Sequence, residues 1–487
     1  MKNTQNQHEF TFRGKRYLYT HDKGEKIMSY STKYNIQPDP SGFRDWDDYS
    51  RQIDIEYRQS IEEGLDIEKY KPLFDVAQSL DFDQYKLELT NILYNIVKNA
   101  ETRADYKYNE PSSLEEIKEL RKPYSFKANI PASKEAFREK ISGAWYGRIC
   151  GCLLGKAVEG IKVREFWPFL KETGNYPMHR YIYKSDITEE IQAKYEYNFM
   201  ASRFADEITC APIDDDTNYT VMAMKLISKY GKDFTPKDVI ECWIERQYKN
   251  SYCTAERLAY INYIQGYLPP ASAVYKNPYR EWIGAQIRGD YFGYINPGNP
   301  ELAAEMAFRD ACISHVKNGI YGEMFVAAMI AIAAVNDDIK DIILGGLAEI
   351  PATSRLYEAI MRLVERYDAG VTKEEAFADI HAEWNDEDAH DWCHTISNAL
   401  IVVASLLYGE GDYSKSICMS VETGFDTDCN GATVGSVLGM RGGESAIDEY
   451  WKKPLNGTLE TTIRWANKVP IASLVKNTLD HLPEDLF

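Results

Sequence analysis

Residues 143–160 read GAWYGRICGCLLGKAVEG, and glycine occupies every fourth position from 143 to 155. This spacing places the glycines on one face of a helix. A glycine inside a helix costs about 1 kcal/mol relative to alanine, so a series of them requires a compensating interaction. A face without side chains allows another backbone to approach closely. The segment therefore predicts a tightly packed helix in the interior of the protein.

A second glycine series follows much later, in residues 422–440, which read ETGFDTDCNGATVGSVLGM and carry glycine at 431, 435 and 439. The two glycine faces either pack against each other at the centre of the domain, or each packs on a different element. Acidic residues flank both series. Glu159 follows the first, and Asp426 and Asp428 precede the second.

A further acidic turn, APIDDDTNYT at residues 211–220, places Asp214, Asp215 and Asp216 before an apolar helical pattern. Aspartate is favoured at helix starts, where free N–H groups and the helix dipole stabilise its charge. Capping explains one carboxylate per helix, but not two or three. Adjacent carboxylates repel one another, so the turn needs full solvation or a cation.

Neither acidic turn is a self-contained calcium loop. In an EF-hand loop the twelfth position is a bidentate glutamate. Counted from Asp426 that position is Val437, and counted from Asp214 it is Lys225. A metal site would therefore have to be assembled from separate turns. Carboxylates suit Mg²⁺, Mn²⁺ or Ca²⁺, and the number present exceeds the need of one ion, which favours two metals.

Helical spacing dominates the chain, and alternating patterns typical of strands are scarce, so we predict an all-α fold. Residues 1–132 are expected to form a helical N-terminal extension and linker, with Pro123 and Pro131 bracketing the linker. Residues 133–487 are expected to form the main domain. Within it, residues 265–300 combine proline, glycine and aromatic residues, a pattern typical of ordered loops that line a site.

Composition restricts the partners. The formal net charge of −19 over 487 residues makes nucleic acid an unlikely ligand on electrostatic grounds. No stretch reaches the roughly 18 uninterrupted apolar residues of a membrane helix. The nine cysteines show no CxxC pair and no zinc-like pairing with histidine, which fits buried thiols in a reducing compartment. We therefore expect a cytoplasmic protein without a nucleic-acid or membrane partner, and the sequence does not indicate its oligomeric state.

Taken together, the motifs resemble those of the ADP-ribosylglycohydrolases, the family that includes dinitrogenase-reductase-activating glycohydrolase. The resemblance covers roughly residues 137–480 and follows the family's order. Its motifs are GAWYGRICGCLLGKAVEG, DDDTNYT, GAQIR, ISHVKNGIYGEMFVAA and GFDTDCNGATVGSVLG. It implies an orthogonal all-α helical bundle that holds two Mg²⁺ or Mn²⁺ ions in a central cleft.

The resemblance also implies roles for individual residues. Glu159 and Asp426 become candidates for the catalytic base, and their roles cannot be separated from sequence. The implied metal ligands are Asp214, Asp215, Asp216, Asp426, Asp428 and Cys429. Two of these depart from the family pattern, because Asp214 and Cys429 stand where the family has threonine. A thiol cannot supply a hard hydroxyl oxygen, so one metal is expected to be held differently or more weakly.

Arg288 and His315 occupy positions that the family places beside the substrate. Each also has a structural alternative: Arg288 would pair with Asp290 or Glu281, and His315 would be a hydrogen-bonded histidine of the interior.

The implied reaction is hydrolysis of the bond at ribose C1 of a small or protein-linked ADP-ribosyl or related ribosyl substrate, by attack of a metal-activated water. Two alternatives stay open. The same fold and metals would act on another small glycoside or nucleoside, because no phosphate-binding basic cluster is visible, or the chain would be a non-catalytic binding protein.

Overall fold

The computed structural model describes residues 7–12, 15–20, 42, 44–131, 133–483 and 486. The chain divides into two compact units, residues 1–44 and residues 45–487. In the first, β1 (Gln7–Phe12) and β2 (Lys15–Thr20) form an antiparallel hairpin. The expectation that residues 1–132 are helical is wrong for this part. Aromatic residues alternate with other types in EFTF and RYLYT, and this period of two suits strands rather than a helix.

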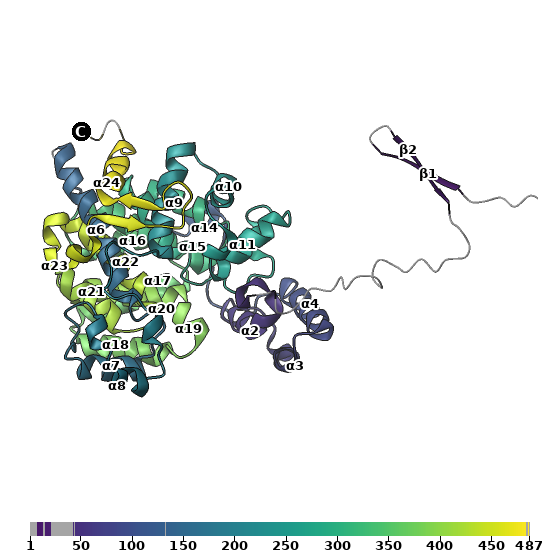
Figure 1. The fold of residues 1–487 in the computed structure, drawn as a ribbon, viewed down its shortest axis with the longest axis horizontal. Coiled ribbons are helices and arrows are strands. Elements are labelled where there is room, and N and C mark those ends of the chain that lie inside the picture. Colours follow the sequence, from purple (N-terminus) through teal and green to yellow (C-terminus); the bar gives the residue numbers. More distant parts are fainter. Residues whose placement is uncertain are drawn as a thin grey trace, which may run out of the picture. The chain divides into compact units, whose positions relative to one another are not determined.

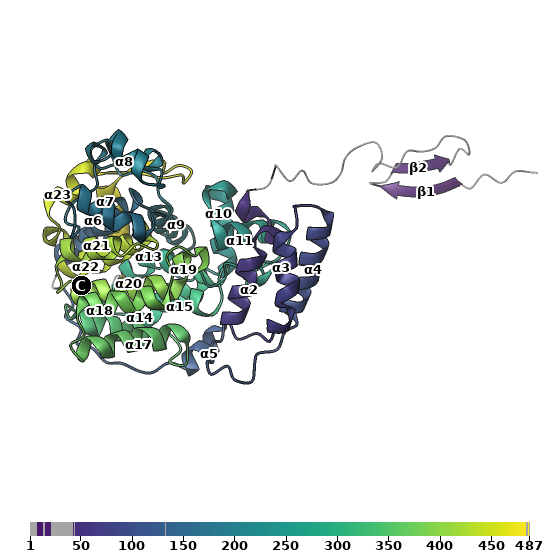
Figure 2. The same ribbon diagram turned by 90° about the horizontal axis from the view of Figure 1, so that it is seen from below.

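The second unit is helical, as predicted, and two of its long helices pack against each other (Figures 1 and 2). They are α6 (Lys134–Lys156), which carries the first glycine series, and α22 (Thr427–Gly442), which carries the second. Around them lie α9 (Asp215–Tyr230), α15 (Lys317–Ala333) and α20 (Thr395–Tyr408).

The other α-helices after residue 133 are short to medium in length. They are α7 (Val163–Glu172), α8 (Glu189–Lys194), α10 (Pro236–Arg246), α11 (Thr254–Ile264), α12 (Ala271–Val274), α13 (Asp290–Tyr294), α14 (Pro300–Ala311), α16 (Ile339–Leu347), α17 (Arg355–Asp368), α18 (Lys373–Glu383), α19 (Ala389–Cys393), α21 (Tyr413–Glu422), α23 (Glu449–Lys452) and α24 (Ile471–Asp480). A small antiparallel pair, β3 (Thr458–Glu460) and β4 (Lys468–Pro470), precedes α24.

The two glycine faces pack directly against each other. A Cβ atom added at Gly151 would lie 2.0 Å from the carbonyl oxygen of Gly431, and one at Gly147 would lie 2.1 Å from that of Gly435. Gly143 meets Gly439 in the same way. The contacts run in opposite order along the two helices, so α6 and α22 are antiparallel. Of the two arrangements that the sequence left open, mutual packing is therefore the correct one.

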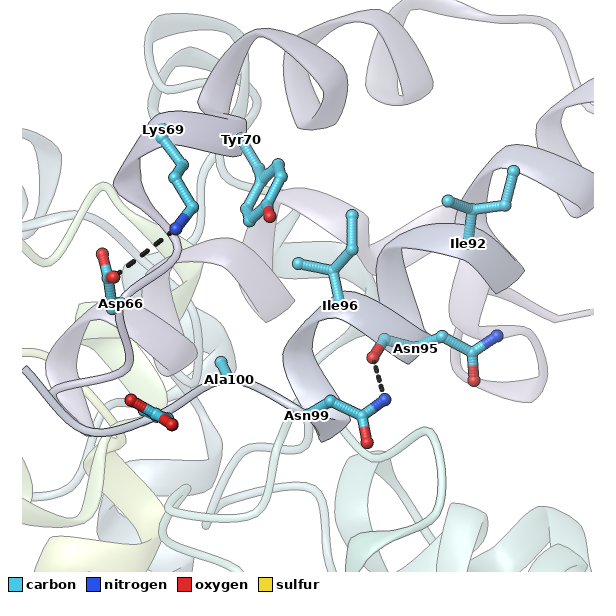
Figure 3. A pocket seen from close by; sticks show the side chains of 9 residues that line it. Asp66, Lys69, Tyr70, Ile92, Asn95, Ile96, Asn99 and Ala100 are labelled. Carbon is cyan, nitrogen blue, oxygen red and sulfur yellow. Dashed lines mark hydrogen bonds and ion pairs between the residues drawn. The ribbon is translucent and has the colours of Figure 1, made fainter.

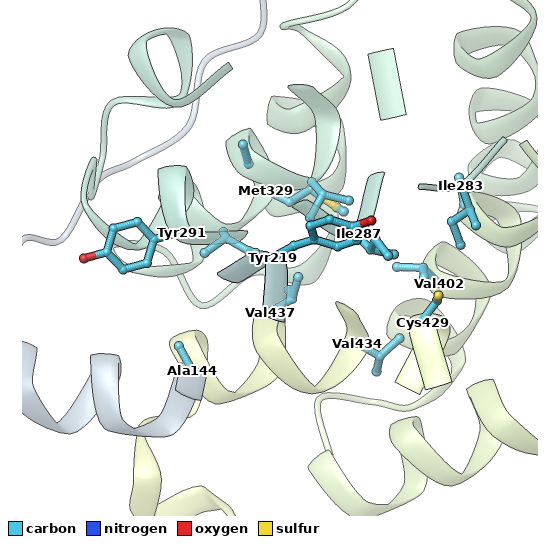
Figure 4. Packing of buried hydrophobic residues seen from close by; sticks show 14 of the residues in the cluster. Ala144, Tyr219, Ile283, Ile287, Tyr291, Met329, Val402, Cys429, Val434 and Val437 are labelled. Atoms are coloured by element: carbon cyan, nitrogen blue, oxygen red, sulfur yellow. The ribbon is translucent and has the colours of Figure 1, made fainter. Parts of the chain in front are cut away.

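Apolar side chains close the space around this helix pair. Figure 4 shows Ala144 of α6 and Val434 and Val437 of α22 in the same buried cluster as Tyr219 and Met329. These residues are almost completely removed from solvent. The centre of the unit is thus fixed by close packing, and the ends of α6 and α22 are held in a constant relation.

The N-terminal helices belong to the same compact unit as the rest, since that unit begins at residue 45. They are α2 (Ile53–Glu62), α3 (Lys71–Ser79), α4 (Gln84–Lys98) and α5 (Leu114–Glu119), and Figure 2 shows α2, α3 and α4 beside one another. Buried ion pairs fasten α2 to the later chain: Arg280 contacts Glu56 at 2.9 Å and Glu63 at 2.5 Å. The segment from 45 to 131 is therefore an integral part of the fold rather than a detached extension.

These N-terminal helices also carry a surface depression of about 550 Å³, shown in Figure 3. Lys69 pairs with Asp66 at 3.6 Å beside it, and the side chain of Asn99 donates to the carbonyl oxygen of Asn95. None of the residues predicted for the active site lines this depression. In the described part of the chain, no helix is both long enough and apolar enough to cross a membrane.

Candidate metal centre

Three helix ends meet beside the glycine contact. Because α6 and α22 are antiparallel, the turn after α6, which carries Glu159, lies near the start of α22, which carries Asp426 and Asp428. The start of α9 approaches both helices. Acidic residues that are far apart in sequence are thereby gathered at one place, as a composite site requires.

The gathered groups come within metal-ligating distance of one another. One carboxylate oxygen of Asp216, one of Asp428 and the sulfur of Cys429 all lie within 4.8 Å of each other. The sulfur of Cys152 forms an equivalent group with Asp214 and Asp216. Asp216 is common to both groups.

A cavity of about 320 Å³ opens beside this cluster. Five of the predicted site residues line it: Glu159, Asp215, Asp426, Asp428 and Cys429. Asp214 and Asp216 do not line the cavity, and they are almost fully buried behind it. The predicted carboxylates thus form both the floor of the cavity and the layer of charge beneath that floor.

Two basic side chains, to which the sequence did not point, form ion pairs with the buried carboxylates of Asp214 and Asp216. Asp214 caps α9 by accepting the backbone N–H of Asp216 at 2.9 Å, and it also accepts a hydrogen bond from Lys156 Nζ at 2.6 Å. Arg148 Nη2 lies 3.1 Å from Asp216 Oδ1, and Arg148 Nη1 lies 2.9 Å from Asp290. Both basic residues belong to the glycine-rich helix α6. Their positions within one turn of the glycines could have indicated that they reach the acidic cluster.

Two oxygens in the cluster have no hydrogen-bond partner although they are fully buried. They are Asp216 Oδ2 and Asp428 Oδ1. A buried carboxylate oxygen without a donor is costly, and cations or ordered water normally satisfy it. The orphaned oxygens, together with an oxygen-rich donor set, fit Mg²⁺ or Mn²⁺.

The carboxylates strongly perturb one another. Burial and the nearby charges of Asp214 and Asp428 raise the pKa of Asp215 to about 7. Burial, and next the charge of Asp428, raises the pKa of Asp426 well above its usual value. For Asp214 the effect of burial is outweighed by Lys156, which lowers the pKa of Asp214. Full ionisation of the cluster is thus unfavourable by itself, and bound cations would restore it.

Cys429, at the position for which the resemblance implied threonine, lies in the wall of the cavity. Burial, and next the charge of Asp216, raises the pKa of the Cys429 thiol well above its usual value. A protonated thiol is a softer and weaker donor than a hydroxyl oxygen, so it suits a hard cation such as Mg²⁺ poorly.

Replacing Cys429 by serine should raise the affinity for Mg²⁺ at least several-fold relative to Mn²⁺, because a hydroxyl oxygen is the harder donor. Competitive titration calorimetry of the two ions on the unmodified chain and on Cys429→Ser measures the ratio. Cys418→Ser, in α21 and away from the cavity, is the matched control. An unchanged ratio would remove Cys429 from the ligand set.

Arg288 and His315, the expected substrate contacts, do not line the cavity. Arg288 is 2% exposed and forms ion pairs with Glu256 at 2.6 Å, with Asp310, and with Glu323 at 3.5 Å. Its partners are therefore neither Asp290 nor Glu281, the two that the sequence suggested. Its link to the site is indirect, because Glu256 itself lines the cavity.

His315 is 1% exposed and shares a hydrogen bond with Ser314 Oγ at 2.8 Å. Burial lowers the pKa of this imidazole well below its usual value. The structure thus agrees with the alternative of a structural histidine. The expectation that Arg288 and His315 contact the substrate therefore fails for one physical reason. The polar turns that carry them are covered by helices packed from distant parts of the sequence.

The remaining cavity wall is largely apolar and includes several aromatic rings. Tyr279 and Trp282 come from the loop region 265–300, whose composition had indicated a site-lining role, and Trp392 comes from α19. Three wall residues come from the N-terminal segment, namely Trp46, Gln52 and Ile55. No pattern in the sequence pointed to these three, because they reach the site only through packing of the N-terminal helices.

Comparison with known proteins places this architecture in a family. A search of curated proteins finds no match. One solved structure similar to this chain is described as "ADP-ribosylglycohydrolase-related protein complex", with 16% sequence identity and a TM-score of 0.45, and the match covers 71% of this chain and 98% of that one. The sequence profile of the ADP-ribosylglycohydrolases matches residues 133–481. The chain therefore belongs to the ADP-ribosylglycohydrolase family, as its motifs predicted, and is a glycohydrolase of that type.

Proposed function

We propose that the protein is a metal-dependent glycohydrolase that cleaves an N- or O-glycosidic bond at C1 of a ribosyl group. The observation that carries the proposal is the convergence of Asp216 and Asp428, from two helices far apart in sequence, with an unpartnered buried oxygen on each. A non-catalytic role is less well supported, since such a cluster destabilises the fold unless a cation is bound.

Glu159 is the better candidate for the base that accepts a proton from the attacking water. Its side chain is exposed to solvent and lines the cavity, whereas Asp426 is 5% exposed. The charge of Asp428, and next burial of the carboxylate, raises the pKa of Glu159 well above its usual value. A carboxylate of raised pKa is a stronger base once it is ionised.

The other residues have supporting roles. The residues that would hold the cations are Asp214, Asp216, Asp426 and Asp428. Hydrogen bonds from Lys156 and Arg148 orient the side chains of Asp214 and Asp216, respectively. Bound divalent cations supply Lewis acidity towards water and towards ribose hydroxyl groups. The carboxylates around the cavity also stabilise the positive charge that develops at C1 as the glycosidic bond breaks.

Glu159→Gln tests the assignment of the base. The variant should lose about 10²- to 10⁴-fold in kcat while its melting temperature stays unchanged, because an amide cannot accept the proton but has the same shape. Release of ribose or ADP-ribose in the presence of Mn²⁺, from ADP-ribosylarginine and from a panel of nucleosides, provides the measurement.

Glu139→Gln is the matched control, since Glu139 lies on the same helix α6, away from the cavity. If Glu159→Gln hydrolyses the substrate as fast as the unmodified chain does, Glu159 is excluded as the base. Hydrolysis that survives complete removal of divalent ions by a chelator would exclude the metal-dependent mechanism itself.

A further inference from the structure

The N-terminal segment supplies part of the wall of the cavity. Trp46, Gln52 and Ile55 stand among the lining residues, while the carboxylates of the wall come from residues 133–481, which match the family. Trp46 is 37% exposed, while the other aromatic residues of the wall are buried or half-buried. Trp46 is therefore the ring of the wall that is most accessible to a ligand arriving from solvent.

Charged contacts fix Trp46 in this position. It belongs to a short 3₁₀ turn, Asp45–Asp47, that contacts α11. Asp47, next to it, pairs with Lys249 at 2.8 Å and with Arg257 at 3.6 Å. The guanidinium of Arg257 also lies 5.1 Å from the centre of the Trp46 ring, within the range of a cation–π contact.

A hydrogen-bonded chain fixes a second ring of the wall. The indole N–H of Trp282 donates to Nδ1 of His390 at 3.1 Å, so Nε2 of His390 carries the proton and lies 3.0 Å from Glu62 of α2. His394 accepts the backbone N–H of Ile396 in the same way. Both imidazoles therefore present N–H groups towards Glu62, and this cluster orients the wall rather than ligating a metal.

Aromatic rings and carboxylates dominate the wall, and positive charge is absent from it. Its aromatic members are Trp46, Tyr219, Tyr279, Trp282 and Trp392. Among the described residues that line the cavity, none is lysine or arginine. The cations next to these rings are already engaged: Arg257 pairs with Asp47, and Lys162, beside Trp392, donates to the carbonyl oxygen of Asp386.

The net charge of the cavity wall determines which ligands it attracts. Of the five carboxylates in the wall, only Glu256 forms an ion pair with a basic side chain, Arg288, which it shares with Asp310 and Glu323. The other four are Glu159, Asp215, Asp426 and Asp428. Lys156 and Arg148 are already paired with Asp214 and Asp216 behind the wall, so the four positive charges of two divalent cations would at most offset these four carboxylates and leave no surplus for a diphosphate. A phosphorylated ligand would thus enter an acidic cavity without a cationic partner, which disfavours its binding.

We propose that the substrate of this site is a phosphate-free N-riboside with a planar aromatic leaving group, and that Trp46 stacks on that group. This inference rests on the proposed function and narrows its substrate class. The cavity volume of about 320 Å³ agrees with a ligand of this size, since small-molecule sites span roughly 300–1,000 Å³. Aromatic walls bind nucleobase-like rings by stacking.

The reaction balances without a further reactant. Water attacks C1, the C1–N bond breaks, and its electron pair leaves with the aromatic nitrogen. Glu159 takes a proton from the water and passes it to the released ring nitrogen, or to solvent where the ring leaves from a positively charged N-riboside and needs no proton. The products are free ribose and the free base.

Matched pairs of compounds test the substrate class. The full chain with Mn²⁺ is assayed on inosine against inosine 5′-phosphate, and on N-ribosylnicotinamide against its 5′-phosphate. Each riboside should exceed its phosphorylated partner by at least about tenfold in kcat/KM, because the phosphate meets only like charge. Equal or faster hydrolysis of the phosphorylated partner would overturn the inference.

Trp46→Ala tests the stacking role. It should raise KM for inosine about tenfold with little change in kcat, leave KM for methyl ribofuranoside unchanged, and be largely rescued in Trp46→Phe. Trp465→Ala, at a tryptophan that is 72% exposed and outside the cavity, is the control. An unchanged KM for inosine, or an equal rise for methyl ribofuranoside, would remove Trp46 from the substrate site.

A binding measurement separates this inference from the proposed function. If no ribosyl compound is hydrolysed, the proposed function fails, and calorimetric titration of inosine and inosine 5′-phosphate into Glu159→Gln with Mn²⁺ still tests the inference. Tighter binding of inosine, weakened in the double variant that adds Trp46→Ala, would support it. Tighter binding of the 5′-phosphate would refute it even if hydrolysis were observed.

Discussion

Replacing Gly151 by valine is expected to abolish stable folding of the helical unit. A Cβ atom at this position would lie 2.0 Å from the carbonyl oxygen of Gly431, which belongs to the backbone of α22 and cannot rotate away. The two helices would have to separate along their whole contact. Overpacking of a core typically costs 1–3 kcal/mol, and here we expect at least about 3 kcal/mol, a large part of the 5–15 kcal/mol that stabilises a typical protein.

Urea denaturation followed by circular dichroism measures this loss, with soluble yield as a second readout if the variant does not refold. Gly42→Val is the control, because an added Cβ at Gly42 meets no atom within 4 Å. Gly151→Ala should give an intermediate loss, since it introduces the clash without the additional methyl groups. A urea midpoint for Gly151→Val equal to that of the unmodified chain would mean that the glycine contact does not hold the two helices together.

Replacing Asp428 by asparagine is expected to abolish stabilisation by divalent cations while leaving the metal-free protein at least as stable as before. Asp428 has an unpartnered buried oxygen, and its charge raises the pKa values of Glu159 and Asp426. Without metal, the substitution therefore removes repulsion. With metal, it removes a ligand. At a concentration one hundred times Kd, a bound ion contributes about 2.7 kcal/mol to the free energy of unfolding, and this gain should disappear.

Melting temperatures with Mn²⁺, with Mg²⁺ and with a chelator provide the measurement. Asp368→Asn, at an exposed aspartate that pairs with Lys340, should respond to metal as the unmodified chain does. If neither the unmodified chain nor Asp428→Asn responds to either ion, the carboxylate cluster is not a metal centre. A full response in Asp428→Asn would exclude only Asp428 from the ligands.

The predictions that the structure confirmed rest on the regular spacing of residues within short segments. Four-residue spacing of glycine fixes a helix face regardless of context, because the geometry of the helix alone brings those positions together. The two glycine-faced helices followed from this spacing, and the all-α fold class followed from helical spacing along the rest of the chain and from the scarcity of strand patterns. The acidic turns beside the glycine series were likewise evident, since several carboxylates in one turn exceed what capping explains.

Packing between distant segments decided the rest. The sequence alone determined two glycine-faced helices and the carboxylates at their ends. It did not determine that Lys156 and Arg148 balance Asp214 and Asp216, that Arg288 is buried among other acids, or that Trp46 reaches the cavity. A helical period specifies which side chains share a face, but the partner of a buried charge depends on which segment covers it, and only the tertiary structure brings those segments together.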